Sequence, residues 1–129
     1  MTKNPCQITI NTVVDGEETR SNKQGELSVF ENGAEIVYHE ENALVSIRFE
    51  GKGATITRKG DYSLYLPLEQ GVQTEGALGL GSSQGAVAID THKVEFSAKE
   101  SNLLAVLHYD LLLGKERQQM RLRLYAKGE

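Results

Sequence analysis

The chain has 129 residues, of which 39% are hydrophobic and 25% charged, and its formal net charge is −4. This length and composition are typical of a single globular domain with one core. An acidic chain does not attract a phosphate backbone, and only 6% of the residues are aromatic, so we expect no nucleic acid partner.

The same features predict a cytoplasmic protein with no membrane partner. The longest apolar run, residues 103–107, is far shorter than a membrane span. Residues 1–5 are not followed by the apolar segment of a secretory signal. The single cysteine, Cys6, cannot form an internal disulfide, which favours a reducing compartment. No sequence feature indicates an oligomeric state.

Most of the chain alternates between apolar and polar residues with a period of two, which is typical of β-strands. In chain order, the expected strands cover residues 6–14, 27–29, 34–41, 43–49, 54–58, 62–68, 72–80, 87–89, 94–98, 103–113 and 120–126. Residues 15–25 are expected to be a polar connection, and residues 87–89 and 94–98 a short pair. The leucine content of residues 103–113 favours helix, but its odd positions form one apolar row, which indicates a strand.

Roughly ten short strands with little or no helix predict a barrel or a sandwich. A meander of this length would leave two exposed edges unless it closed on itself, and closure removes both. We therefore predict an all-β fold, a single antiparallel up-and-down barrel over residues 1–129.

Two charged residues interrupt this pattern on the face that should be buried. Glu40 shares its strand phase with Tyr38 and its apolar neighbours, and Arg58 shares its phase with Ile56. A buried charge needs a partner or a ligand. Arg58 could receive an anionic head group with Tyr38 sharing the hydrogen bonding, or Glu40 and Arg58 could form a structural ion pair. The structural pair is the default interpretation.

Other chemistry-bearing residues indicate neither a metal site nor a catalytic centre. His92 is in phase with Val94, whereas His39 and His108 lie on other faces, so no same-face pair of histidines exists to hold zinc. Ser82 and Ser83 lie between glycines, but without the spacing or the following helix of a nucleophile elbow or a phosphate loop. We expect no cofactor and no enzymatic activity.

Several short motifs, in order and spacing, resemble those of a known family. They are Tyr38-His39-Glu40, Arg58-Lys59-Gly60, Gly85, Asp90-Thr91 and Leu107-His108-Tyr109-Asp110-Leu111. The chain resembles the calycin-like β-barrel proteins of bacteria typified by YwiB, a domain of unknown function. The resemblance implies a barrel related in shape to lipocalins and fatty-acid-binding proteins. It does not indicate a ligand, because the family has no established activity. Residues 80–85 depart from the Tyr-x-Thr-like stretch of the relatives, so an interior site shaped by that tyrosine would be altered here.

Three functions remain open, of which the least favoured is an enzyme that uses Glu40, Tyr38 and Arg58 at a barrel mouth, because no nucleophile, metal cluster or pair of carboxylates accompanies them. The other two carry equal weight. The first is a binding protein for a small anionic or apolar ligand, with Tyr38, Glu40, Arg58 and Tyr109 as the ligand-binding residues. The second is a barrel filled by its own side chains, which acts through protein partners, since many inward positions are bulky. The polar residues 16–24 offer no helical lid, so a ligand would be small or bound near the surface.

Overall fold

The computed structural model describes residues 2–99 and 101–128, which form β-strands joined by short turns. The strands are β1 (Thr2–Val14), β2 (Glu17–Phe30), β3 (Gly33–Glu40), β4 (Ala43–Glu50), β5 (Gly53–Gly60), β6 (Tyr62–Glu69), β7 (Gln73–Leu80), β8 (Ser83–Lys99), β9 (Asn102–Leu113) and β10 (Glu116–Gly128). The described part of the chain contains no helix, and therefore none long and apolar enough to cross a membrane.

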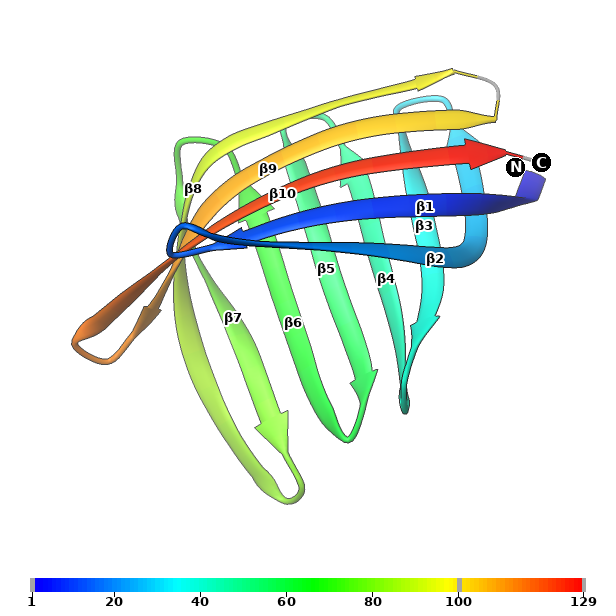
Figure 1. Ribbon diagram of the computed structural model, residues 1–129. Helices are drawn as coiled ribbons and strands as arrows, with labels where there is room; N and C mark the ends of the chain where they lie inside the picture. The colour runs from blue at the N-terminus through cyan, green and yellow to red at the C-terminus, as the bar shows by residue number, and fades with distance from the viewer. Residues whose placement is uncertain (1, 100, 129) are drawn as a thin grey trace.

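Each strand pairs antiparallel with its neighbours along the chain, and β1 pairs with β10 to close the barrel. The predicted all-β, up-and-down, closed architecture is confirmed. The two ends of the chain lie side by side (Figure 1), as the pairing of Cys6 with Gly128 requires. In the same view β3 to β7 run in one direction, and β1, β9 and β10 cross it.

The prediction of a polar connection over residues 15–25 is wrong, because this segment is the first half of β2. Asp15 and Gly16 form a two-residue turn, with φ values of 49° and 89°. Positive φ at both positions is what the tight hairpin turn favoured by Asp-Gly requires. Residues 17–24 of β2 pair with β1 alone, whereas residues 25–30 also pair with β3. This first part of the strand is polar on both faces, as its position at the rim of the barrel allows.

Strand β2 bends along its length (Figure 1), and at Gly25 it begins to pair with β3 as well as β1. A Cβ atom at this position would lie 2.3 Å from the carbonyl oxygen of Val37, 2.9 Å from Cδ1 of Ile8 and 3.0 Å from Cβ of Tyr38. Only glycine fits at this corner, where β2 passes from its part paired with β1 alone to its part paired with both β1 and β3.

The predicted short pair at residues 87–89 and 94–98 is instead one continuous strand, β8, with a bulge between Thr91 and Lys93. The bulge shifts the phase, so Thr91 and Val94 both point inward and His92 is exposed. The turn between β6 and β7 satisfies the freed backbone groups. Gly71 N–H donates to the Thr91 carbonyl at 2.9 Å, and Gln70 Oε1 accepts from Val94 N–H at 2.9 Å.

The core fills one end of the barrel more completely than the other. At the end that holds the β2–β3 and β4–β5 turns, the inward side chains are buried or partly buried, with Phe49 and Phe96 in ring contact at 5.5 Å between centroids. At the opposite end, inward positions near the strand termini are exposed: Tyr62 by 38%, Leu78 by 40%, Leu80 by 66% and Leu113 by 42%. We call this second end the open end.

Candidate ligand-binding site

An interior cavity of about 230 Å³ lies toward the open end of the barrel. All four residues predicted from the sequence as ligand-binding, Tyr38, Glu40, Arg58 and Tyr109, line it. The apolar part of its wall consists of Ile10, Val45, Ile47, Ile56, Leu64, Leu66, Leu111, Met120 and Leu122, and the remaining polar part of Thr12, Ser21, Lys23 and Tyr62.

Arg58 is at the centre of a hydrogen-bonded cluster at the wall of this cavity. Its side chain is 8% exposed and extends from β5. Nη1 donates to the Tyr62 carbonyl at 2.7 Å and lies 2.9 Å from Asp61 Oδ1, and Nε lies 3.4 Å from Glu40 Oε2. The guanidinium also stacks over the Tyr62 ring, 3.6 Å from its centroid.

The charges of this cluster stabilise one another. Burial works to lower the pKa of Arg58, but the hydrogen bond to Asp61, the Tyr62 ring and Glu40 outweigh it and raise that pKa. The hydrogen bond from Arg58 holds the pKa of Asp61 below its usual range. Both groups are therefore ionised near neutral pH, as an ion pair requires.

Glu40 and Arg58 belong to strands that are not adjacent, because β4 lies between β3 and β5. Glu40 is opposite Ala43, and Ala43 is opposite Gly60. Arg58 is opposite Val45, two residues along β4, so the ion pair crosses β4 diagonally. The ion pair that the strand phases predicted therefore forms across an intervening strand.

Tyr38 and Tyr109 lie in the cavity wall on β3 and β9 and are 6% and 3% exposed. Neither phenolic hydroxyl has a hydrogen-bond partner among the described residues. Burial raises the pKa of both tyrosines, and the Glu40 charge raises that of Tyr38 further. Both hydroxyls stay protonated, so each is available as a hydrogen-bond donor toward the cavity.

Lys23 also lines the cavity. The sequence pattern does not indicate this role, because it predicts a polar connection over residues 15–25. It lies opposite Ile8, a core residue, and cross-strand partners share a face, so its side chain points inward. Reading Asp15-Gly16 as a hairpin turn would have placed Thr19, Ser21 and Lys23 on this inner face.

The histidines do not gather around the cavity. His39 is exposed, as its phase predicts, and His92 is exposed because the bulge reverses the phase that was expected for it. No group of three or more His, Cys, Asp or Glu side chains that could hold a metal ion lies in the part of the chain that the structure describes.

A second polar cluster lies on the outer face at the bulge. Asp110, expected on the wetter face of its strand, is only 6% exposed because two side chains cover it. His92 Nε2 lies 3.0 Å from Asp110 Oδ2, and Arg117 Nη1 lies 2.6 Å from the same oxygen. Arg117 Nη2 also reaches Asp90 at 3.1 Å. The cluster ties β8, β9 and β10 together and leaves Arg117 with two carboxylate partners.

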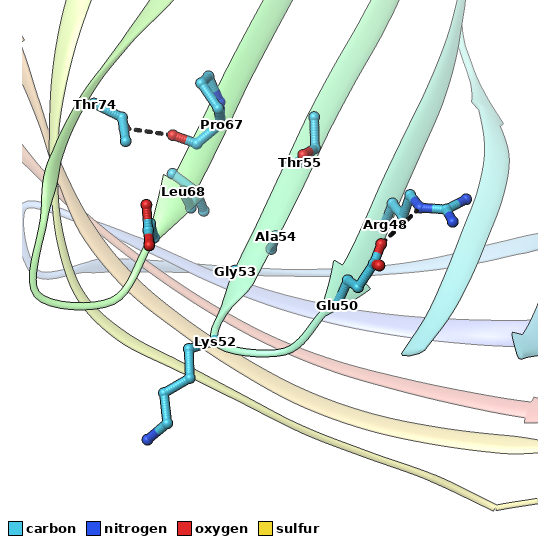
Figure 2. A pocket seen from close by; sticks show the side chains of 10 residues that line it. Arg48, Glu50, Lys52, Gly53, Ala54, Thr55, Pro67, Leu68 and Thr74 are labelled. Carbon is cyan, nitrogen blue, oxygen red and sulfur yellow. Dashed lines mark hydrogen bonds and ion pairs between the residues drawn. The ribbon is translucent and has the colours of Figure 1, made fainter. Parts of the chain in front are cut away.

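A hollow of about 330 Å³ on the outside of the barrel, near the ends of β4, β5 and β6, is larger than the interior cavity (Figure 2). Several of its polar groups are already used within the protein. Arg48 pairs with Glu50 at 3.5 Å and stacks over Phe30, and Thr74 donates to the carbonyl of Pro67. Lys52 extends away from the other side chains (Figure 2). This hollow offers less to a ligand than the cavity does.

Comparison with known proteins gives a family and a fold. Residues 6–124 match the family model described as "Domain of unknown function (DUF1934)". The crystal structure of ywiB protein from Bacillus subtilis is similar, with a TM-score of 0.87 at 16% sequence identity, over 98% of this chain and 93% of that one. At that identity the likeness shows the shared barrel fold alone. No curated protein matches the chain. Because the family model covers most of its length, the chain belongs to the DUF1934 family, as the sequence resemblance to YwiB-like barrels predicted.

Proposed function

We propose that this protein is a non-enzymatic carrier or sensor that binds one small amphipathic molecule at the open end of its barrel. The observation that supports this most is the cavity itself. Its floor is apolar, while its polar side includes the hydroxyls of two buried tyrosines, Tyr38 and Tyr109, which have no hydrogen-bond partner among the described residues. A mostly apolar site with a few polar groups is suited to a ligand with a polar head and an apolar body.

The volume limits the ligand to a small one. A water molecule occupies about 30 Å³ in the liquid, so 230 Å³ has room for a molecule with roughly eight to ten non-hydrogen atoms. Pockets for drug-sized ligands start at about 300 Å³. The ligand is therefore smaller than a long-chain lipid, or leaves part of itself outside the barrel.

The open end provides the way in. The exposed side chains of Tyr62, Leu78, Leu80 and Leu113 are at inward positions around this end. Exposed apolar surface of this kind is typical of a binding groove. The β1–β2 connection is a two-residue turn and supplies no lid over the entrance.

One observation favours the alternative, a self-filled barrel that acts through protein partners. Arg58 is engaged through Nε and Nη1 by Glu40, Asp61 and the Tyr62 carbonyl, so its charge is compensated without a ligand. The closed end is also packed without exposed core residues. We favour the carrier because these facts concern Arg58 and the closed end, and leave the two tyrosine hydroxyls unexplained.

Native mass spectrometry of the protein, purified gently from its own cells, tests the proposal. We expect a stoichiometric small-molecule adduct that denaturation releases. Leu122→Trp, which fills the cavity from β10, should lose the adduct. Leu104→Trp, at a position 55% exposed on β9, should keep it. A bare mass for the wild-type protein would support the self-filled barrel instead, and an adduct that survives in Leu122→Trp would show that the ligand does not bind in this cavity. The cytoplasmic location also remains part of this proposal, and rests on the chain having a single cysteine.

A further inference from the structure

We propose that the ligand is a monocarboxylate whose head group is bound by Lys23 together with the hydroxyls of Tyr38 and Tyr109, and not by Arg58. This inference rests on the proposed binding function and names the chemical class of the ligand. It differs from the sequence-based hypothesis, in which Arg58 is the anchor for an anion.

Arg58 is less suited to this role because most of its donors are already in use. Nη1 is engaged by the Tyr62 carbonyl at 2.7 Å and by Asp61 at 2.9 Å, and Nε is directed at Glu40 at 3.4 Å. One face of the guanidinium is covered by the Tyr62 ring. A bidentate contact with a ligand carboxylate needs Nη2 together with Nη1 or Nε, so it would displace a partner that the protein already supplies.

Lys23, in contrast, has no ion pair or hydrogen bond among the described residues. It is half-buried and points into the cavity from β2. The last rung between β2 and β3 joins Gly25 to Tyr38, and the two strands part beyond it. Lys23 and Glu40 therefore line the two sides of the gap in which the cavity lies.

The charges that line the cavity fit a single negative charge. They are Lys23, Arg58 and Glu40, and Arg58 and Glu40 neutralise each other at 3.4 Å. Asp61, the closer carboxylate partner of Arg58 at 2.9 Å, is 61% exposed and does not line the cavity. Lys23 is therefore the cation in the cavity wall that has no ion pair among the described residues, and a monoanionic head group would pair with it.

The two tyrosines can donate to an acceptor on the ligand. Both hydroxyls are protonated and without a partner among the described residues, so each can donate to an oxygen of the ligand. An ammonium head group would be repelled by Lys23. A carboxylate has two oxygens and accepts from an ammonium and two hydroxyls at once.

The test is isothermal titration calorimetry with three probes of the same chain length near neutral pH: octanoate, 1-octanol and octylamine. These probes match the cavity in size and differ in head group. We expect the wild-type protein to bind octanoate at least tenfold more tightly than 1-octanol, and to bind octylamine most weakly. Lys23→Met should remove this preference while keeping the affinity for 1-octanol. Tyr38→Phe and Tyr109→Phe should each reduce the affinity for octanoate several-fold.

Lys127→Met is the matched control, because Lys127 is exposed on β10 and lies outside the cavity. It should leave all three affinities unchanged. If wild-type protein binds 1-octanol as tightly as octanoate, or if Lys23→Met keeps the preference, the carboxylate anchor is wrong and the binding function stands. If none of the three probes binds to wild-type protein, both the anchor and the proposed function are wrong.

Discussion

Glu40 and Arg58 are tolerated on the inner face of the barrel because each has a charged partner close by. Arg58 combines hydrogen bonds to Glu40, Asp61 and a backbone carbonyl with stacking on Tyr62. The phases of two strands predicted that Glu40 and Arg58 face the interior. The contributions of Asp61 and Tyr62 could not be predicted, because they depend on the path of the turn after Gly60.

Removing Arg58 should therefore destabilise the protein more than removing an ordinary surface arginine. Arg58→Met leaves the half-buried Glu40 carboxylate without a partner, so we expect thermal unfolding several degrees lower than in the wild type. The double variant Arg58→Met/Glu40→Gln should recover much of this loss. Arg48→Met is the control, since its ion pair with Glu50 is exposed on both sides. Additive losses in the double-mutant cycle would show that Glu40 and Arg58 are not coupled.

His108 is a second residue whose surroundings are informative. Burial lowers its pKa, and the charges of Arg121, Lys93, His92 and Arg123 lower it further. Its folded-state pKa thus lies below the unfolded value of about 6.5, so the unfolded chain binds the proton more readily. The contribution of neutral His108 to stability is complete above about pH 6.5 and is lost as the pH falls below it.

Urea unfolding at a series of pH values tests this effect. His108→Gln should show a smaller loss of unfolding free energy between neutral pH and about pH 5 than the wild type does. His39→Gln, at an exposed position of β3, is the control and should keep the wild-type slope. Equal slopes for His108→Gln and the wild type would contradict the assignment.

The alternation of apolar and polar residues predicted most of the strands, but it did not predict where strands bend. Residues 15–25 have polar residues on both faces, so alternation carries no signal there, and only Asp15-Gly16 indicates the hairpin. The bulge at His92 could not be predicted, because it depends on Gln70 and Gly71 from another turn reaching the backbone of β8.

The corner at Gly25 should be intolerant of any side chain. Gly25→Ala would place Cβ against the Val37 carbonyl and Tyr38, and we expect a loss of unfolding free energy of about 1–3 kcal/mol, the usual cost of overpacking. Gly85→Ala on β8 is the matched control, since no atom lies within 4 Å of its Cβ position and its φ is not positive. Chemical denaturation measures both. A Gly25→Ala protein as stable as Gly85→Ala would show that the corner is not constrained.

The Asp110 cluster should make the junction of β8, β9 and β10 sensitive to acid. Burial works to raise the pKa of Asp110, but hydrogen bonds from His92 and Arg117 outweigh it and hold that pKa below its usual range. Its contribution to stability is complete above the unfolded pKa of about 3.9, and is lost as the pH falls through the lower folded value.

Asp110→Asn should therefore be less stable than the wild type near neutral pH, and the difference should narrow below about pH 4. Thermal unfolding at several pH values measures this difference. Glu75→Gln, at an exposed position on β7, is the control and should follow the wild type throughout. A difference between Asp110→Asn and the wild type that persists unchanged into strong acid would contradict the ionic role of the carboxylate.

For the whole molecule, the sequence was sufficient to predict a single closed barrel, and the family comparison and the ywiB structure agree. The predicted site residues do meet, since Tyr38, Glu40, Arg58 and Tyr109 line one cavity. The volume of that cavity, and the presence of Lys23 in its wall, depend on how β2 and β3 part beyond Gly25. Strand periodicity holds no information about such a separation.

A small ligand in the cavity at the open end can be detected by an NMR titration of the labelled protein with octanoate, following backbone amides and leucine methyl groups. We expect chemical-shift changes concentrated on Lys23, Tyr38, Tyr109 and the methyl groups of Leu64, Leu66 and Leu122. The chemical shifts of residues 48–55, at the outer hollow, should not change. Shifts confined to the outer surface, or none at saturating octanoate, would contradict binding in this cavity.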